Sequence, residues 1–297
     1  MWQTLLHTLF FGSAFALFNP FANATVTTLD DAQRRITLNK PAQRIISLAP
    51  HATELLFAAG AGPLIVGVSE YSDYPEQAKK IASIGNIFAL DLERVIALKP
   101  DLVVVWGTGN AKLLSNKLRD NHITVFESEP HNFETIATSM ERLAILTGTE
   151  PIGKVAATKF RNRLESLRQT YKLTEGQKYV RVFYQVWRKP LMTLNDQHLV
   201  SSAIRLCGGQ NIFAGMKEIS PTISVEAVLS SNPHAIIASS GEKQDVLADW
   251  LQFPGLLAVN KANLFTINGD WMNRSGPRIL DGTEVLCKNL TKVRTTL

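Results

Sequence analysis

Two copies of one helix–proline–strand pattern constrain the fold of this 297-residue chain more than any other feature. In the first copy, residues 91–99 place Val95 and Leu98 on one face of a predicted helix, which Pro100 ends. Proline has no backbone N–H group and cannot extend a helix, so the apolar run at residues 102–105 begins a new element. Such a run is typical of a parallel strand that is covered on both faces.

The second copy lies 133 residues later, where Glu226 corresponds to Glu93, Pro233 corresponds to Pro100, and His234-Ala-Ile-Ile-Ala238 takes the place of the strand. Repetition over this distance indicates two similar lobes, each with a glutamate in the first turn of a helix. An acid at this position favours the start of a helix through the helix dipole, which is the simpler interpretation of both glutamates.

Strands and helical patterns alternate along the chain, which predicts βα units and mainly parallel sheets. Between the two copies, a long helix is predicted to begin near Pro151, with an apolar stripe that runs from Ile152 and Val155 to Tyr171. At 1.5 Å per residue this helix would be roughly 34 Å long, enough to run along both lobes. We therefore expect an α/β fold with a first lobe at residues 25–148, a connecting helix at 149–173 and a second lobe at 174–297.

Residues 1–24 have the pattern of a signal peptide. The apolar segment from Leu5 to Phe18 is too short to span a membrane comfortably, and Ala22-Asn23-Ala24 provides a cleavage signal. A buried N-terminal helix is the alternative. Secretion through a cleaved signal peptide is the hypothesis that we follow.

The chain has two cysteines, Cys207 and Cys287. In an oxidising compartment a lone pair of cysteines indicates a disulfide, which here would join the last predicted helix to the second lobe. Two buried free thiols are the alternative.

Composition and motifs argue against several function classes. The net charge is +5, and no basic run is interleaved with aromatic residues, so we expect no nucleic-acid partner. The chain lacks G-x-S-x-G, H-E-x-x-H, P-loop and C-x-x-C motifs, so we expect no enzyme. The histidines lack metal-ligand spacing. His51 and Glu54 could share a metal, but a loop histidine beside a first-turn acid is the simpler interpretation, and we expect neither a metal nor a resident cofactor.

The predicted strand ends carry aromatic side chains. The first strand runs into a loop at Pro50 and a helix from Leu55, and other strand-end loops begin at Tyr71 and Trp106. Ligands of parallel sheets bind outside the carboxyl ends of the strands. Flat apolar walls with a few polar groups predict a cleft for a large planar ligand. The residues of this kind are Tyr71, Tyr74, Trp106, Trp187 and Trp271, with Asp270, Arg274 and Arg278 beside them.

From about Arg44 to its C-terminus, the chain resembles the periplasmic cobalamin-binding proteins of ABC importers, which are class III binding proteins with two lobes and a helical backbone. The motifs that carry the resemblance are Ser-Leu-Ala-Pro-His-Ala-Thr-Glu (47–54), Tyr-Ser-Asp-Tyr-Pro (71–75), Asp-Leu-Glu-Arg-Val-Ile-Ala-Leu-Lys-Pro-Asp-Leu-Val (91–103), Cys-Gly-Gly-Gln-Asn-Ile-Phe (207–213) and Asp-Trp-Met-Asn-Arg (270–274).

The resemblance implies a set of binding residues. The family's ligand contacts map onto Pro50, His51, Tyr71, Trp106, Asp270 and Arg274, and its disulfide maps onto Cys207 and Cys287. Some family aromatics are replaced: Ile87 stands beside Phe88, Val186 beside Trp187, and Ser220-Pro221 at a third place. We therefore add Phe88, Trp187 and Trp271 to the candidate pocket.

The resemblance also implies partners and a location. Cobalamin or a related corrinoid would be the transported ligand of a monomer in the periplasm. Glu93 and Glu226 would dock on an inner-membrane permease dimer that carries its ATPase subunits. Two alternatives remain: a haem or ferric-siderophore binder of the same fold, with His51 as an axial ligand, and a secreted enzyme with two α/β lobes.

Overall fold

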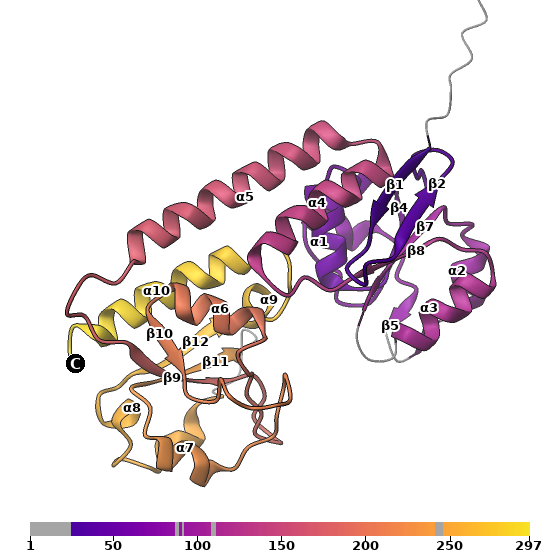
Figure 1. The fold of residues 1–297 in the computed structure, drawn as a ribbon. Coiled ribbons are helices and arrows are strands. Elements are labelled where there is room, and N and C mark those ends of the chain that lie inside the picture. The colour runs from indigo at the N-terminus through magenta and orange to yellow at the C-terminus, as the bar shows by residue number, and fades with distance from the viewer. Residues whose placement is uncertain (1–24, 87–88, 91, 108–110, 241–245) are drawn as a thin grey trace, which may run out of the picture.

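The computed structural model describes residues 25–86, 89–90, 92–107, 111–240 and 246–297 (Figure 1). The predicted signal peptide lies outside these residues. The strands are β1 Val26–Leu29, β2 Arg35–Leu38, β3 Ile45–Ser47, β4 Ile65–Val68, β5 Gly85–Asn86, β6 Ala89–Leu90, β7 Leu102–Trp106, β8 Val125–Ser128, β9 Val180–Gln185, β10 Gly209–Asn211, β11 Ala235–Ser240 and β12 Leu264–Asn268. The α-helices are α1 Pro50–Ala58, α2 Leu92–Ala97, α3 Ala111–Asp120, α4 Phe133–Thr147, α5 Glu150–Tyr171, α6 Leu199–Leu206, α7 Val225–Ser231, α8 Leu257–Asn260, α9 Gly269–Met272 and α10 Ile279–Arg294. The described residues also form short 3-10 helices, namely η1 Gly62–Leu64, η2 Glu76–Lys80 and η3 Ala248–Trp250.

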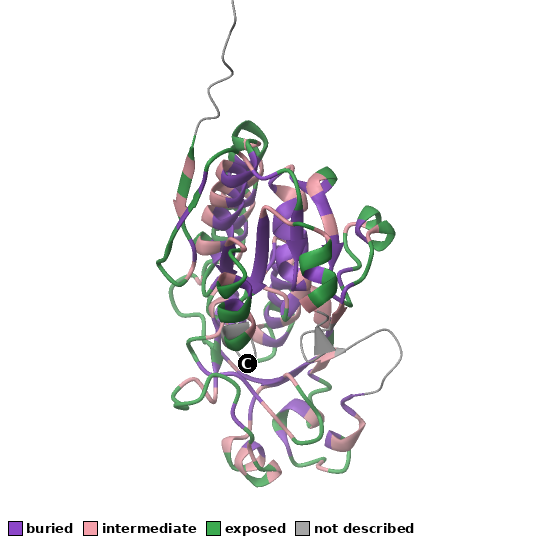
Figure 2. Ribbon diagram, turned by 90° about the vertical axis from the view of Figure 1, so that its right-hand side faces the viewer, coloured by how far each residue is buried: buried purple, intermediate pink, exposed green. Residues whose placement is uncertain are grey.

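Two four-stranded parallel sheets form the two lobes. The strand order is β4-β3-β7-β8 in the first lobe and β10-β9-β11-β12 in the second. Buried residues are concentrated along the strands and on the helix faces that cover them (Figure 2). The predicted fold class, two α/β lobes with mainly parallel sheets and one long connecting helix, is confirmed.

The repeated sequence pattern forms equivalent elements. In the first lobe α2 leads into β7, and in the second lobe α7 leads into β11; both strands lie between two parallel neighbours. Each helix is followed by a residue in the left-handed conformation, Lys99 with φ 47° and Asn232 with φ 41°. This conformation ends a helix by turning the chain out of the helical path, and a proline follows at once in both copies.

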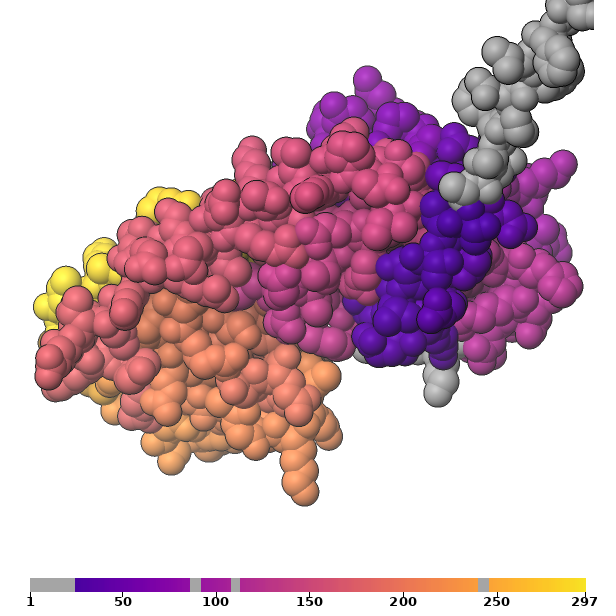
Figure 3. All heavy atoms as spheres, turned by 45° about the horizontal axis from the view of Figure 1, so that its top comes forward, coloured from indigo at the N-terminus to yellow at the C-terminus, as the bar shows by residue number. Residues whose placement is uncertain are grey.

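The long helix α5 lies along both lobes, as Figure 3 shows from above. Its N-terminal half packs against α4 so closely that a Cβ atom on Gly153 would lie 2.3 Å from the Cβ of Ala144. The predicted apolar stripe is wrong in its first turns, because Ile152 and Val155 are exposed. The close helix pair requires small residues instead, so Gly153 and Ala157 face inward there.

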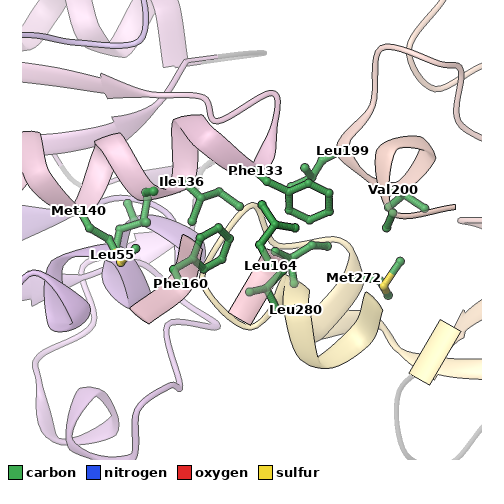
Figure 4. Packing of buried hydrophobic residues seen from close by; sticks show 14 of the residues in the cluster. Leu55, Phe133, Ile136, Met140, Phe160, Leu164, Leu199, Val200, Met272 and Leu280 are labelled. Atoms are coloured by element: carbon green, nitrogen blue, oxygen red, sulfur yellow. The ribbon is translucent and has the colours of Figure 1, made fainter. Parts of the chain in front are cut away.

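A continuous hydrophobic core runs from one lobe to the other through α5 (Figure 4). Phe160 and Leu164 of α5 lie between side chains of the first lobe, such as Leu55, and side chains of the second, such as Leu199. The lobes are therefore packed on one another at the helix, while their sheets form separate layers.

Local differences from the sequence-based expectation have simple causes. Helix α1 begins at Pro50, not at Leu55, because a proline in the first turn needs no N–H partner and its fixed φ suits a helix.

No helix in the described ranges is long and apolar enough to cross a bilayer.

The two cysteines form a disulfide. Cys207 follows α6, Cys287 lies in α10, and their Cα atoms are 4.5 Å apart. Both side chains are fully buried in the shared core. The bond closes a loop with a sequence separation of 80 residues and ties the last helix to the second lobe.

We expect the variant Cys207→Ala/Cys287→Ala to lose about 4 kcal/mol of unfolding free energy, because the disulfide limits the entropy of the unfolded chain. Urea unfolding of the exported wild-type protein, with and without reductant, measures the effect, and reductant should leave the variant unchanged. Labelling of denatured, unreduced wild-type protein should find no free thiol. Two labelled thiols in that sample would contradict the bond.

Candidate ligand-binding cleft

A cavity of about 890 Å³ lies where the carboxyl ends of the strands in the two lobes face one another. It is lined by Tyr71 and Trp106 from the first lobe and by Gln185, Val186, Trp187, Arg188, Lys189, Ser239, Val246, Gly269, Asp270, Asn273 and Arg274 from the second. Tyr71 follows β4, Trp106 ends β7, Gln185 ends β9 and Asp270 follows β12. Parallel sheets thus gather residues that are far apart in the sequence at one cleft, as predicted for such folds.

Three aromatic side chains form exposed walls of the cavity: Tyr71 is 75% exposed, Trp106 41% and Trp187 62%. The indole N–H of Trp106 donates to Glu129 Oε1 at 3.0 Å, and that of Trp187 donates to the carbonyl oxygen of Lys189 at 3.0 Å. Because these polar edges are already satisfied by the protein, the rings are fixed and their apolar faces remain free for a ligand.

The buried amide of Gln185 forms part of the cavity floor. Its Nε2 donates to the carbonyl oxygen of Val246 at 2.9 Å, and its Oε1 accepts from the indole N–H of Trp250 at 2.8 Å. These two bonds fix which end of the amide is the donor and which is the acceptor. Sequence reasoning missed this residue, since a glutamine at the end of a buried strand has no distinguishing motif.

Arg274 connects the cavity wall to both lobes. Its guanidinium lies 2.8 Å from Asp270 of its own lobe and 2.7 Å from Asp73 of the first lobe. Burial alone would raise the pKa of Asp73, but the hydrogen bond from Arg274 and its positive charge outweigh that effect and lower the pKa. Arg274 is only 13% exposed, so its orientation toward the cavity is held by carboxylates on two sides.

Behind this arginine, the buried carboxylate of Glu54 joins the lobes. Arg278 donates to its two oxygens at 3.0 and 2.6 Å, and Arg274 lies 3.5 Å away. The ring of Tyr74 stacks on the Arg278 guanidinium at 4.0 Å. Glu54 and Arg278 are 224 residues apart, so no local pattern indicates this pairing.

His51 lies behind the cavity wall. Its Nε2 is 3.2 Å from the hydroxyl and 3.3 Å from the carbonyl oxygen of Ser128, and its ring meets Trp106 edge-on at 6.1 Å. Burial lowers the pKa of His51 to about 4, so the imidazole is neutral at pH 7. Neither His51 nor its half-buried neighbour Pro50 lines the cavity; their contact with a ligand stays a prediction.

The structure gives no support to a metal shared by His51 and Glu54. The imidazole Nε2 is engaged with Ser128, and the carboxylate of Glu54 is engaged with Arg278. Within the described ranges, no three histidine, cysteine or acidic side chains are grouped in a way that could hold a metal ion.

The remaining predicted residues lie elsewhere. Trp271 is in α9, where its Cβ faces Gly282 of α10, and it is not among the residues that line the cavity. Phe88 lies outside the described residues. Glu93 and Glu226 are exposed in the first turns of α2 and α7. These two helices lie in different lobes (Figure 1).

Residues 45–270 match the model of the periplasmic binding protein family. This chain belongs to that family. One relative in the family is the vitamin B12-binding protein of Vibrio cholerae, which is 39% identical over 254 residues, 84% of this chain and 90% of that protein. The crystal structure of the periplasmic vitamin B12 binding protein BtuF of Vibrio cholerae matches with a TM-score of 0.78 and 39% identity, over 85% of this chain and 98% of that one.

At lower sequence identity, the comparison with solved structures shows the fold alone. The periplasmic heme-binding protein RhuT from Roseiflexus sp. RS-1 matches with a TM-score of 0.73 at 21% identity, over 85% of this chain and 99% of that one. The family fold therefore does not by itself specify a ligand, and the cavity side chains must do so.

The neutral state of His51 predicts a pH dependence of stability. Its pKa is about 4 in the folded chain against an ordinary value of 6.5, so below pH 6.5 the unfolded chain binds a proton that the folded chain does not. Stability from this residue is complete above pH 6.5 and falls by roughly 3 kcal/mol as the pH drops toward 4.

Urea unfolding between pH 8 and pH 4.5 measures this loss. The variant His51→Gln should show a shallower decline than the wild type, and the comparison at pH 8 gives the cost of the substitution itself. Parallel curves for the two proteins would contradict the assignment.

Proposed function

We propose that this protein binds cobalamin between its lobes in the periplasm and delivers it, as a monomer without catalytic activity, to an inner-membrane ABC importer. The observation that carries the proposal is the cavity of about 890 Å³ with three exposed aromatic rings from both lobes. The 39% identity to a vitamin B12-binding protein over 84% of the chain supports the choice of ligand.

The chemistry of the cavity suits a corrinoid. A corrin ring is large and flat, and its edge carries many uncharged amide groups. The faces of Tyr71, Trp106 and Trp187 offer apolar contact to such a ring. Asp270 and Arg274 offer an acceptor and a donor for the peripheral amides. His51 would act through Trp106, whose ring it contacts.

Titration of the purified protein with cyanocobalamin, haemin and a ferric siderophore tests the proposal. We expect one-to-one binding of cyanocobalamin at micromolar concentration or below, detected by calorimetry and tryptophan fluorescence. Trp106→Ala should weaken it by roughly 1–3 kcal/mol, because a buried aromatic contact is lost. Trp106→Phe is the control that keeps a flat ring. Binding of haemin, with a haem absorption spectrum, in a protein that ignores cyanocobalamin would reject the proposal.

Glu93 and Glu226 are proposed to dock on the permease. Each is exposed near the start of the helix that leads into a central strand of its lobe. The backbone N–H of Glu226 and the hydroxyl of Ser224 lower the pKa of Glu226, so its carboxylate is ionised at neutral pH. Two acids, one in each lobe, would meet cations of the permease and fix the orientation of the complex.

We expect Glu93→Arg/Glu226→Arg to abolish cobalamin transport by the reconstituted importer. Exposed charges contribute little to folding, so ligand affinity and melting temperature should stay nearly unchanged. Glu165→Arg/Glu175→Arg makes the same change in net charge near α5 and should transport normally. Normal transport by Glu93→Arg/Glu226→Arg would contradict the docking role and leave both glutamates with a role in helix initiation only.

A further inference from the structure

Each of the two arginines among the described lining residues pairs with a carboxylate that does not line the cavity, and Arg274 also pairs with Asp270, which does. Arg274 contacts Asp73 at 2.7 Å, from the loop after β4 in the opposite lobe. Arg188 makes two parallel bonds to Asp249 of η3, at 2.7 and 2.6 Å. Neither aspartate is among the residues that border the cavity.

The backbone at Asp249 is anchored beside the cavity through its neighbour Trp250, which bonds to the lining residue Gln185. The next residue, Trp250, is buried and donates its indole N–H to Gln185. The hydrogen bond from Arg188 and its charge lower the pKa of Asp249, so this carboxylate is ionised at neutral pH. Arg188 therefore pairs with an ionised carboxylate through two hydrogen bonds.

Among the described residues, the two aspartates balance the positive charge of the side chains that line the cavity. Among the described residues that line the cavity, the charged side chains are Arg188, Lys189, Arg274 and Asp270, which gives a net charge of +2. Asp73 and Asp249, each bonded to one of these arginines, bring the total to zero. The uncharged amide groups of a ligand ring lose nothing from this balance. An anionic ligand finds both guanidinium groups already occupied, with carboxylates close behind them.

We propose that Asp73 and Asp249 determine specificity by selecting a tetrapyrrole whose ring carries uncharged amides over one whose ring carries carboxylates. This inference rests on the proposed cobalamin function and adds the basis of discrimination. Amide groups of a corrinoid share the guanidinium N–H groups without displacing either aspartate. A carboxylate on the same ring must compete with the aspartates for the guanidinium groups and stay near their negative charge, and specificity of this kind comes from repulsion of the wrong ligand.

The test uses two ligands that differ at one group. Cyanocobalamin is compared with its monocarboxylic acids, in which one propionamide has been hydrolysed to a carboxylate. Calorimetry gives the ratio of the two dissociation constants for the wild type, for Asp73→Asn, for Asp249→Asn and for the double variant. Asparagine keeps the shape of each aspartate, and a ratio within one variant cancels any general loss of affinity.

We expect the wild type to bind the monocarboxylic acids about tenfold more weakly than cyanocobalamin, because a ligand carboxylate next to the two aspartates is repelled by them. The double variant should reduce or reverse that preference for at least one isomer. Its binding of that isomer should weaken with added sodium chloride, since salt screens charge pairs, while its binding of cyanocobalamin should not. A change in structure alone would not produce this difference in salt dependence.

Asp281→Asn is the matched control. Asp281 pairs with Arg163 between α5 and α10 and does not line the cavity, so its ratio should equal that of the wild type. If the ratio of the two dissociation constants is the same in the wild type and the double variant for every isomer, Asp73 and Asp249 do not determine specificity. Failure of the wild type to bind cyanocobalamin at all would instead overturn the proposed function.

Discussion

The packing of α5 against both lobes is the constraint on which the rest of the structure depends. Its buried side chains belong to a core that continues into the helices of either lobe. Protein cores are close-packed and respond to displacement with discrete rearrangements, so the lobes cannot rotate freely about this helix. The distance between the aromatic walls of the cleft is therefore set by the packing of α5 in the shared core and not by the cleft residues themselves.

The Glu54–Arg278 pair adds a directional contact to this non-directional packing. Burying a carboxylate is costly unless hydrogen bonds and an opposite charge compensate for the lost water. Glu54 belongs to the first lobe, and both of its arginines belong to the second. Separation of the lobes at this point would leave charges without partners. The pair thus fixes one relative orientation, and it holds Arg274 at the cavity wall from behind.

Local chemistry explains how much of this was predictable from the sequence. Apolar runs after proline predicted strands such as β7 and β11, and the parallel-sheet rule then placed Trp106 and Asp270 at one cleft. The same reasoning could not find the Glu54–Arg278 pair, because only tertiary packing brings these residues together. It also could not tell that Trp271 lies outside the cavity lining, since a four-residue helix has too little periodicity to reveal which way its side chains point.

The shared core has a consequence for how the protein unfolds and is degraded. Domains that pack on separate cores can open one at a time, whereas elements of one core unfold together. A ligand that binds only the folded chain shifts the unfolding equilibrium of that shared core by mass action. Occupancy of the cleft should therefore shield remote segments, such as the ends of α5 and α10, from proteases. The lifetime of the whole chain then depends on the supply of its ligand.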